Sequence, residues 1–210
     1  TPSKVVCVGL NYKAHAEELG YPLPNMPSFF LKPPSSIIGN GEPIVLPSGM
    51  GRIEHEAELA MVVGKVCRNL TPEEAEESLF GFTCANDVTA REVQKVDPLI
   101  GHCKSYDTFC PIGPWIETEL EDINDLSIRC LVNGEVRQSA NTGDMIFRPL
   151  DLLCFLSRVM TLMPGDVILT GTPPGISPIQ ADDVVQVSIE GIGTLSNPVE
   201  GPGPEEKILQ

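Results

Sequence analysis

The chain has no long apolar segment, no paired cysteine motif and few positive charges. No apolar stretch approaches the length of a membrane span, and Thr1 does not open a secretory signal. The 7 cysteines are odd in number, lie mostly inside apolar runs and form no C-x-x-C pair, which favours buried free thiols over a disulfide framework or a zinc site. We therefore expect a cytoplasmic protein, although an organelle-targeting segment lost before Thr1 would leave no trace.

The shortage of positive charge also limits the partners. There are 14 Lys and Arg residues against 29 Asp and Glu, a formal net charge of −15, which argues against nucleic acids and anionic membranes as partners. A small anionic substrate remains compatible, because a bound divalent ion dominates the field around it. The sequence also lacks a Walker loop, a G-x-G-x-x-G loop and a G-x-S-x-G elbow.

The pattern of apolar residues predicts a β-rich α+β fold in one domain spanning residues 1–210, and not a doubly wound sheet. We expect strands at 4–9, 29–32, 43–46, 166–170 and 183–189. Asn133-Gly134 between two apolar runs predicts a hairpin of strands 126–132 and 135–139. Helices are expected at 11–19, stopped by Gly20, and at 150–160. A capping box at 71–74 predicts a helix ending near Gly81, and a second at 89–92 predicts one beginning just past Asp87.

Three carboxylates stand out in the run 52–63, which we interpret as a single strand. Side chains alternate along a strand, so Glu54, Glu56 and Glu58 share one face. That face becomes apolar beyond Glu58, so its last acids point toward a core. Asp87 ends another apolar run, and two strand-borne Glu with one Asp would make an all-oxygen site for Mg²⁺ or Mn²⁺. The spacing alone is equally consistent with a solvated acidic edge strand, which is the more common case.

Other residues can carry chemistry. His15 and Glu18 lie three apart on the first helix and share a face, so Glu18 can orient His15 as a general base; a surface pair has the same spacing. Lys104 follows a loop rich in Gly and Pro, where its ammonium can meet a carboxylate or be a plain surface charge. The hydroxyl of Thr172 and nearby backbone N–H groups can hold an anion. We expect His55, on the opposite side of its strand, to be packed or to act as a cap.

Five segments, taken in order, resemble the fumarylacetoacetate hydrolase superfamily. The similarity runs from about residue 5 to residue 189, and each motif is weak alone but the ordered set is specific. The segments are Gly9-Leu10-Asn11-Tyr12-x2-His15-x2-Glu18, Glu56-Ala57-Glu58-Leu59, the run from Asn86-Asp87 to Val93-Gln94, Lys104-Ser105-Tyr106-Asp107, and Leu169-Thr170-Gly171-Thr172-Pro173-Pro174-Gly175.

The resemblance implies a mixed β-sandwich roll with a few short helices, usually assembled as a homodimer. It implies Mg²⁺ (or Mn²⁺) on Glu56, Glu58 and Asp87. It implies a water-activating dyad of His15 and Glu18 on a segment that orders over substrate, and substrate contacts from Lys104, Gln94 and Thr172. Glu54 receives no role. Members of the acylpyruvase type often have Arg directly before Asn-Tyr, where this chain has Leu10.

The implied chemistry leaves several reactions open. Hydrolysis of the C–C bond of an acylpyruvate-type 2,4-dioxo acid is favoured, because the pair of His15 and Glu18 is complete. Oxaloacetate decarboxylation or tautomerisation, and isomerisation of a 2-hydroxyhepta-2,4-diene-1,7-dioate, would use the same site on a 2-oxo acid or dicarboxylate. A non-catalytic dicarboxylate-binding relative is the alternative of another class. The proline-rich segment after the first helix fits either a lid over the site or a plain connection.

Overall fold

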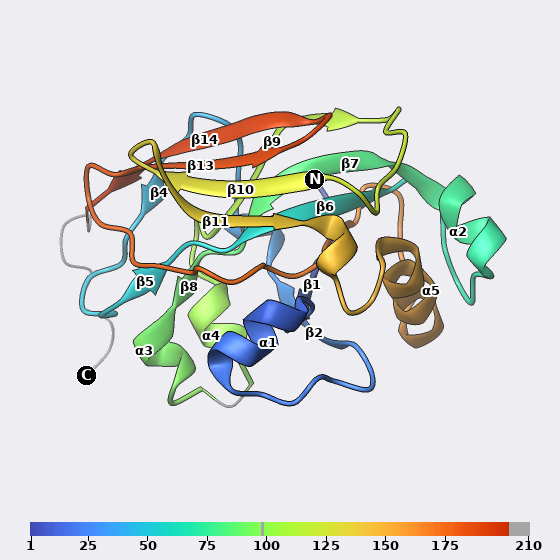
Figure 1. The fold of residues 1–210 in the computed structure, drawn as a ribbon, viewed down its shortest axis with the longest axis horizontal. Helices are drawn as coiled ribbons and strands as arrows, with labels where there is room; N and C mark the ends of the chain where they lie inside the picture. The colour runs from blue at the N-terminus through green and yellow to red at the C-terminus, as the bar shows by residue number, and fades with distance from the viewer. Residues whose placement is uncertain (98, 202–210) are drawn as a thin grey trace.

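The computed structural model describes residues 1–97 and 99–201 and consists of two packed β-sheets with short helices at their edges (Figure 1). The larger sheet is mixed, with strand order β2-β1-β12-β6-β7-β9-β3. Its strands are β1 (Val5–Gly9), β2 (Ser28–Lys32), β3 (Ile37–Ile38), β6 (Ala57–Val63), β7 (Leu79–Asn86), β9 (Cys110–Glu117) and β12 (Val167–Leu169).

The smaller sheet has the order β11-β10-β13-β14-β4 and faces the first. Its strands are β4 (Ile44–Val45), β10 (Ser127–Val132), β11 (Glu135–Asn141), β13 (Val184–Ile189) and β14 (Gly193–Glu200), and a separate pair is formed by β5 (Ile53–Glu54) and β8 (Thr89–Ala90). Strand β10 shows why this is a two-layer fold, because Ile128 and Cys130 are buried while Arg129 between them is exposed. Such alternation is typical of a sheet with one face on the core.

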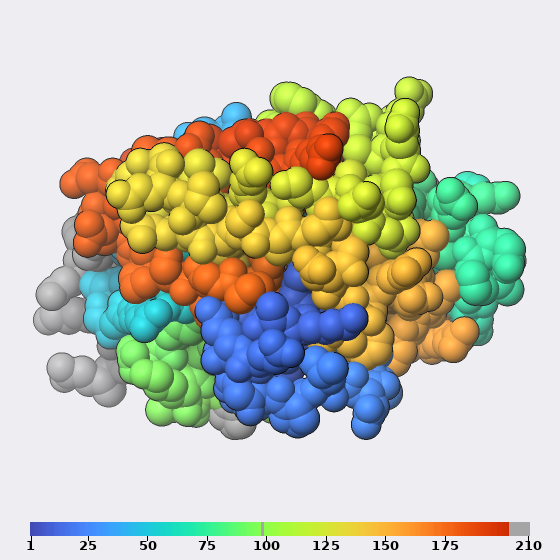
Figure 2. Space-filling view, in the orientation of Figure 1, coloured from blue at the N-terminus to red at the C-terminus, as the bar shows by residue number. Residues whose placement is uncertain are grey.

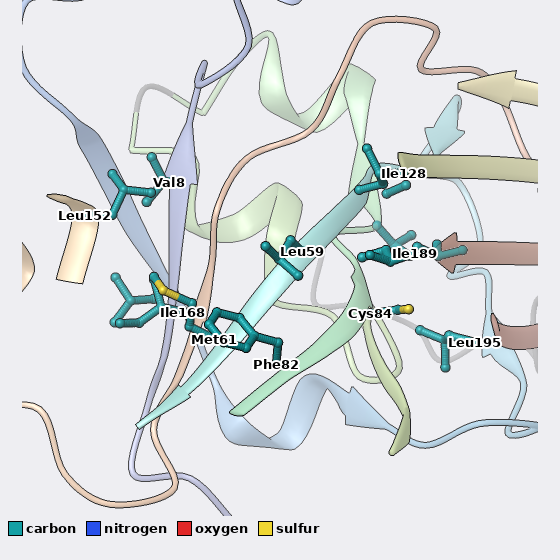
Figure 3. Packing of buried hydrophobic residues seen from close by; sticks show 14 of the residues in the cluster. Val8, Leu59, Met61, Phe82, Cys84, Ile128, Leu152, Ile168, Ile189 and Leu195 are labelled. Carbon is teal, nitrogen blue, oxygen red and sulfur yellow. The ribbon is translucent and has the colours of Figure 1, made fainter. Parts of the chain in front are cut away.

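The main core lies between the two sheets. Leu59 and Cys84 from the larger sheet meet Ile128, Ile189 and Leu195 from the smaller one (Figure 3). The opposite face of the larger sheet is also buried, in a second cluster that includes Val5, Cys7, Ala60, Ala85 and Cys110. Strand β6 is therefore covered on both faces, and all seven of its residues are buried. All seven cysteines of the chain are free and buried, as expected from the sequence.

The helices gather at two ends of the sheets. Helices α2 (Pro72–Ser78) and α5 (Pro149–Val159) contact each other at one end, whereas α1 (Lys13–Leu19), α3 (Arg91–Gln94) and α4 (Gly101–Lys104) lie together below the sheets in the view of Figure 1. In the described part of the chain, no helix is both long and apolar enough to cross a membrane. The group of α1, α3 and α4 borders the candidate functional site.

Most expected elements are present with small shifts in their ends. The hairpin of β10 and β11, the helix that Gly20 ends in the left-handed conformation, and the helix α5 are confirmed. The run 52–63 is not one strand, since the chain leaves the β5–β8 pair after Glu54 and enters the large sheet only at Ala57. The capping box at Thr71 is confirmed, but its helix ends at Ser78, where β7 takes over.

The second predicted capping box is wrong. Thr89 and Ala90 form strand β8, and the helix begins only at Arg91 without a side-chain cap. The hydroxyl of Thr89 instead lies 2.8 Å from the carbonyl oxygen of Asp87 and 3.2 Å from Glu56 Oε1, so its single proton is shared between these two acceptors. Thr89 has the sequence position of a helix N-cap, but its hydroxyl instead bonds to two neighbouring acidic residues.

Asp166 anchors the N-terminus of the chain, and its replacement by Asn is expected to destabilise the fold. Its buried carboxylate accepts from the amides of Ser3, Lys4 and Met163 and from the hydroxyl of Ser3, and lies 2.5 Å from Lys4 Nζ. Hydrogen bonds to a charged group are each worth about 1.5–3 kcal/mol. We expect Asp166→Asn to lower the free energy of unfolding at pH 7 by about 2–3 kcal/mol, measured by urea denaturation.

The pH dependence of this loss has a defined sign. Burial raises the pKa of Asp166, but Lys4 and Ser3 outweigh burial and hold the pKa below its ordinary value. A depressed carboxyl pKa stabilises the fold above the unfolded pKa of about 3.9, and the contribution is lost as the pH falls through the folded pKa. The difference between Asp166→Asn and the parent should therefore shrink below about pH 4. The exposed Asp151→Asn is the control, and a difference that is constant with pH would contradict the assignment.

Candidate metal centre and active site

The predicted metal ligands come together where β6 begins and β7 ends. These strands are antiparallel neighbours, with Ala57 opposite Asn86. The residues just outside this pair, Glu56 and Asp87, therefore also meet, and the amide of Asp87 donates to the carbonyl of Glu56 at 2.8 Å. Three carboxylate oxygens, one from each of Glu56, Glu58 and Asp87, lie within 4.8 Å of one another, and all three residues are buried. Glu58 lies on β6, whereas Glu56 immediately precedes this strand and Asp87 immediately follows β7, so the pairing of the two strands brings together the cluster that the sequence predicts.

Two buried lysines and the half-buried Arg91 surround two of these carboxylates. Lys104 Nζ donates to Glu56 Oε2 at 2.9 Å and to Asp87 Oδ2 at 2.7 Å. Lys32 Nζ lies 2.5 Å from Asp87 Oδ1 and also donates to the carbonyl of Phe109. Arg91 bonds both Glu54 and Glu56. Asp87 and Glu56 are therefore compensated charges in a dry environment, where an unpaired ion would be costly.

Glu58 is the exception in this cluster. It accepts from the amide of Gly171, and among residues 1–97 and 99–201 no cationic side chain is paired with it. Burial and the negative charges of Asp87 and Glu56 raise the pKa of Glu58 well above its ordinary value. Burial also tends to raise the pKa of Glu56, but the positive charges of Lys104 and Arg91 outweigh burial and hold this pKa well below the usual range.

These residues fit a divalent metal ion. Three converging carboxylates form the oxygen donor set that Mg²⁺ and Mn²⁺ prefer. Without a cation, Glu58 faces two negative neighbours in a buried place, and a bound ion would remove that repulsion. The fit is supported by the donor chemistry and by the missing counter-charge at Glu58, and the structure indicates a divalent metal site here.

The predicted dyad is formed on α1. His15 Nδ1 lies 2.8 Å from Glu18 Oε2, and the other oxygen of Glu18 accepts from the amide of Gly175 at 3.1 Å. An ionised Glu18 requires the proton on Nδ1, which leaves the Nε2 lone pair of neutral His15 free to accept a proton. His15 is buried and Glu18 is partly exposed. In Figure 2 the N-terminal segment, in blue, lies beside the orange chain that follows β12, as the contact to Gly175 requires.

One cavity of about 780 Å³ joins all the predicted site residues. Its lining includes the eight side chains that the sequence singled out: His15, Glu18, Glu56, Glu58, Asp87, Gln94, Lys104 and Thr172. Gln94 Oε1 accepts from Arg91 Nη1 at 2.8 Å, so its amide N–H groups remain available to the cavity. Leu10 also lines it, and Tyr21 places the start of the predicted lid at its edge. Whether this segment moves remains a prediction.

The turn that carries Thr172 depends on two glycines. Gly171 and Gly175 both have positive φ values, 100° and 95°. A Cβ at Gly175 would lie 2.2 Å from the carbonyl oxygen of Arg137, so the turn packs directly on β11. Only glycine combines this backbone conformation with so close an approach.

Sequence reasoning missed three functional neighbours. Arg91 contacts Glu56 and lines the cavity. The one sequence feature that indicated a role for Arg91 was its position three residues before Gln94. Lys32 ends an apolar strand and is the one buried residue of that strand, and a lysine that closes an apolar run was the available sign. Glu54, to which no role was given, pairs with Arg91 and Arg52. His55 is packed as predicted, with ring nitrogens bonded to Gln138 and Ser177, and burial lowers its pKa.

Comparison with known proteins agrees with this geometry. Residues 4–200 match the family model of the fumarylacetoacetate (FAA) hydrolase C-terminal domain. The chain belongs to the fumarylacetoacetate hydrolase family. The resemblance seen in the five sequence segments and the predicted fold class are thereby confirmed.

Three relatives in the family show the range of its reactions. A structure named 5-carboxymethyl-2-hydroxymuconate delta-isomerase from Mycobacterium smegmatis is 48% identical, with a TM-score of 0.90, and the match covers 97% of this chain and 80% of that one. The mitochondrial oxaloacetate tautomerase FAHD2A of Homo sapiens is 43% identical, covering 94% of this chain and 67% of the relative. Maleylpyruvate hydrolase from Sphingobium sp. SYK-6, solved with manganese(II) and pyruvate, is 37% identical with a TM-score of 0.84, covering 96% and 72%.

Proposed function

We propose that this protein is a metal-dependent enzyme that interconverts the enol and keto forms of a 2-oxo dicarboxylic acid by moving a proton between C3 and the C2 oxygen. The observation that carries the proposal is the single cavity that holds both the carboxylate cluster and the oriented base His15. The higher identity to a tautomerase and an isomerase, compared with a hydrolase, favours proton transfer over the hydrolysis that we preferred from the sequence.

Glu56, Glu58 and Asp87 would hold the divalent ion, Mg²⁺ or Mn²⁺. When bound, the ion supplies Lewis-acid polarisation of the 2-oxo group, which makes the C3 protons more acidic. Lys104 orients Glu56 and Asp87 through its two hydrogen bonds and lowers the pKa of Glu56, and Lys32 holds the second oxygen of Asp87. The two lysines thus fix the direction in which these carboxylates face the cavity.

His15 would transfer the proton. With Nδ1 held by Glu18, Nε2 would take a proton from C3 and deliver it to the C2 oxygen to form the enol, and would carry it from the enol O–H back to C3 in the other direction. The carboxylate of Glu18 stabilises the imidazolium that forms between these steps. The amide of Gly175 holds Glu18 in turn, so the dyad is tied to the turn that carries Thr172.

Gln94 and Thr172 would orient the substrate. Because Arg91 takes the Gln94 carbonyl oxygen, Gln94 presents its N–H groups to a substrate carboxylate. Leu10 lines the cavity where the acylpyruvase type often has Arg, so one cationic contact typical of that branch is replaced by an apolar side chain. This replacement is a further reason to place the acylpyruvases second.

Hydrolysis of acylpyruvate-type 2,4-dioxo acids is the second candidate. It is favoured by the same pair of His15 and Glu18, which is equally suited to take a proton from an attacking water. The likeness to a hydrolase solved with manganese(II) and pyruvate supports it as well. The two reactions differ in whether water is consumed, so products distinguish them.

A metal-supplemented substrate panel tests the proposal. Enol oxaloacetate, hydroxy-dienedioates, acylpyruvates and fumarylpyruvate are each incubated with the protein and Mg²⁺ or Mn²⁺. Faster loss of the enol without new acids supports the tautomerase or isomerase. Release of pyruvate with a second acid establishes the hydrolase instead, and absence of both reactions refutes both candidates.

We also infer that a single catalytic domain works in a homodimer, with a small-molecule 2-oxo acid as its substrate. The family resemblance supports the dimer, and the net charge of −15 argues against nucleic acid and membrane partners. Light scattering on the purified chain gives the mass of the assembly, and a monomer at all concentrations would contradict the dimer.

A further inference from the structure

Gln138 on β11 is a buried polar side chain that lies behind the cavity and has no part in the mechanism proposed for the site. It is 1% exposed. Its Oε1 accepts from the amide of Ala57 at 3.0 Å, and its Nε2 donates to the carbonyl of Pro173 at 2.7 Å. Because one neighbour is a backbone donor and the other a backbone acceptor, the orientation of the amide group is determined.

This orientation fixes the direction of the neighbouring hydrogen bonds. His55 Nδ1 lies 3.1 Å from Gln138 Oε1 and must therefore carry the proton, so the other nitrogen of neutral His55 accepts from the hydroxyl of Ser177 at 2.8 Å. On the other side, Gln138 Nε2 donates to the hydroxyl oxygen of Thr172 at 2.8 Å. A chain of donors runs in one direction from Ser177 to Thr172.

The chain ends with the Thr172 hydroxyl donating to the carbonyl of Ala57 at 3.0 Å. A hydroxyl has one proton and two lone pairs. The proton is used by Ala57 and one lone pair by Gln138, so one lone pair remains on a residue that lines the cavity. In this arrangement Thr172 can accept a hydrogen bond from a ligand but cannot donate one.

We propose that Gln138 is a positioning residue that holds Thr172 as a hydrogen-bond acceptor, so that the site selects the hydroxyl-bearing enol form of its substrate. This inference rests on the proposed function and specifies which of the two tautomers the resting site recognises. The enol carries an O–H at C2 that can donate to Thr172, whereas the keto form offers only an oxygen lone pair, which would meet the lone pair of Thr172.

The proposal predicts which ligands the site prefers. Lactate and pyruvate have the same heavy atoms and both bind metals through the carboxylate and C2 oxygen, but only lactate has a proton on that oxygen. The ratio of their affinities therefore reports the donor or acceptor state of Thr172 independently of turnover. Both enantiomers of lactate are measured by calorimetry at saturating Mg²⁺, and the tighter one is used.

Variants of Thr172 and Gln138 then test the roles. Thr172→Val removes the hydroxyl at nearly constant volume and should lower the preference for lactate over pyruvate by roughly 3- to 10-fold, the weight of one hydrogen bond. Thr172→Ser should retain the preference. Gln138→Met frees the Thr172 hydroxyl to rotate and should lower the preference, but should have no further effect in the Thr172→Val background. Gln138→Asn, too short to span Ala57 and Thr172, replaces Gln138→Met if that variant does not fold.

The outcomes separate this inference from the proposed function. An unchanged or increased lactate preference in Thr172→Val shows that the hydroxyl does not accept and overturns the proposal. If the Gln138 and Thr172 substitutions have additive effects on the ratio of lactate to pyruvate affinity, Gln138 is only a structural residue and its positioning role is overturned. If these tests fail while the parent still turns over enol oxaloacetate, only the inference is wrong; if the ratios behave as expected without turnover, only the proposed function is wrong.

Discussion

Replacement of His15 by alanine is expected to lower turnover by roughly 10²- to 10⁴-fold, the usual contribution of a positioned general base. The expectation holds for proton transfer at C3 and for activation of water, because both need the Nε2 lone pair that Glu18 makes available. Glu18→Gln should have a smaller effect, since an amide oxygen still accepts from Nδ1 but does not stabilise the imidazolium. The loss should appear in kcat more than in KM.

Two measurements accompany this prediction. Metal content, determined by elemental analysis, should remain that of the parent in both variants, because neither residue belongs to the carboxylate cluster. Glu17→Gln is the matched control, as Glu17 is an exposed carboxylate on the same helix. A His15→Ala protein with parental turnover of every substrate in the panel would remove the dyad from the mechanism.

Removal of the divalent metal is expected to abolish activity, and Mg²⁺ or Mn²⁺ should restore it. A Lewis acid at the reacting oxygen is worth several kcal/mol, or on the order of 10³-fold in rate. Asp87→Asn should reproduce the loss and lower the bound metal, since it removes a ligand charge. Glu92→Gln is the control, because Glu92 lines the same cavity, pairs with Lys95 and lies outside the cluster.

Asparagine is a better substitute than alanine at this position, because its amide oxygen can still accept a hydrogen bond from one of the two lysines that Asp87 binds. Asp87 is the partner of both Lys32 and Lys104, and leaving a buried charge without its partner typically costs about 3–5 kcal/mol. Thermal unfolding of Asp87→Asn therefore accompanies the activity assay. Full activity of a chelated, metal-free sample would contradict the metal-dependent mechanism, whichever variant is used.

The carboxylate cluster is only partly accessible to local rules, and the family resemblance supplies the rest. The spacing indicates that Glu56 and Glu58 share a face, although only Glu58 lies within β6, and Asp87 joins them through the pairing of β6 with β7. The cations could not be located in this way. Lys32, Arg91 and Lys104 reach the cluster from β2, α3 and α4, and their convergence depends on tertiary packing that no local pattern contains.

The wrong predictions also have local causes. Thr89 followed by Glu92 has the spacing of a helix cap, but its hydroxyl is used by Asp87 and Glu56, and the chain stays extended to pair with β5. The run 52–63 alternates like one strand, yet His55 lies at a break where its ring bonds Gln138 and Ser177. In both places, long-range hydrogen bonds around the site override the local preference.

The seven buried thiols allow the opening of the folded structure to be measured by thiol labelling. Burial raises the pKa of Cys84, Cys110 and Cys130 to about 12, so the folded protein offers a thiol reagent neither access nor thiolate. Modification must wait for the structure to open, and its rate then reports how often that happens. Because ligands that bind only the folded state make opening rarer, metals and substrates that bind this protein should slow the labelling of its thiols.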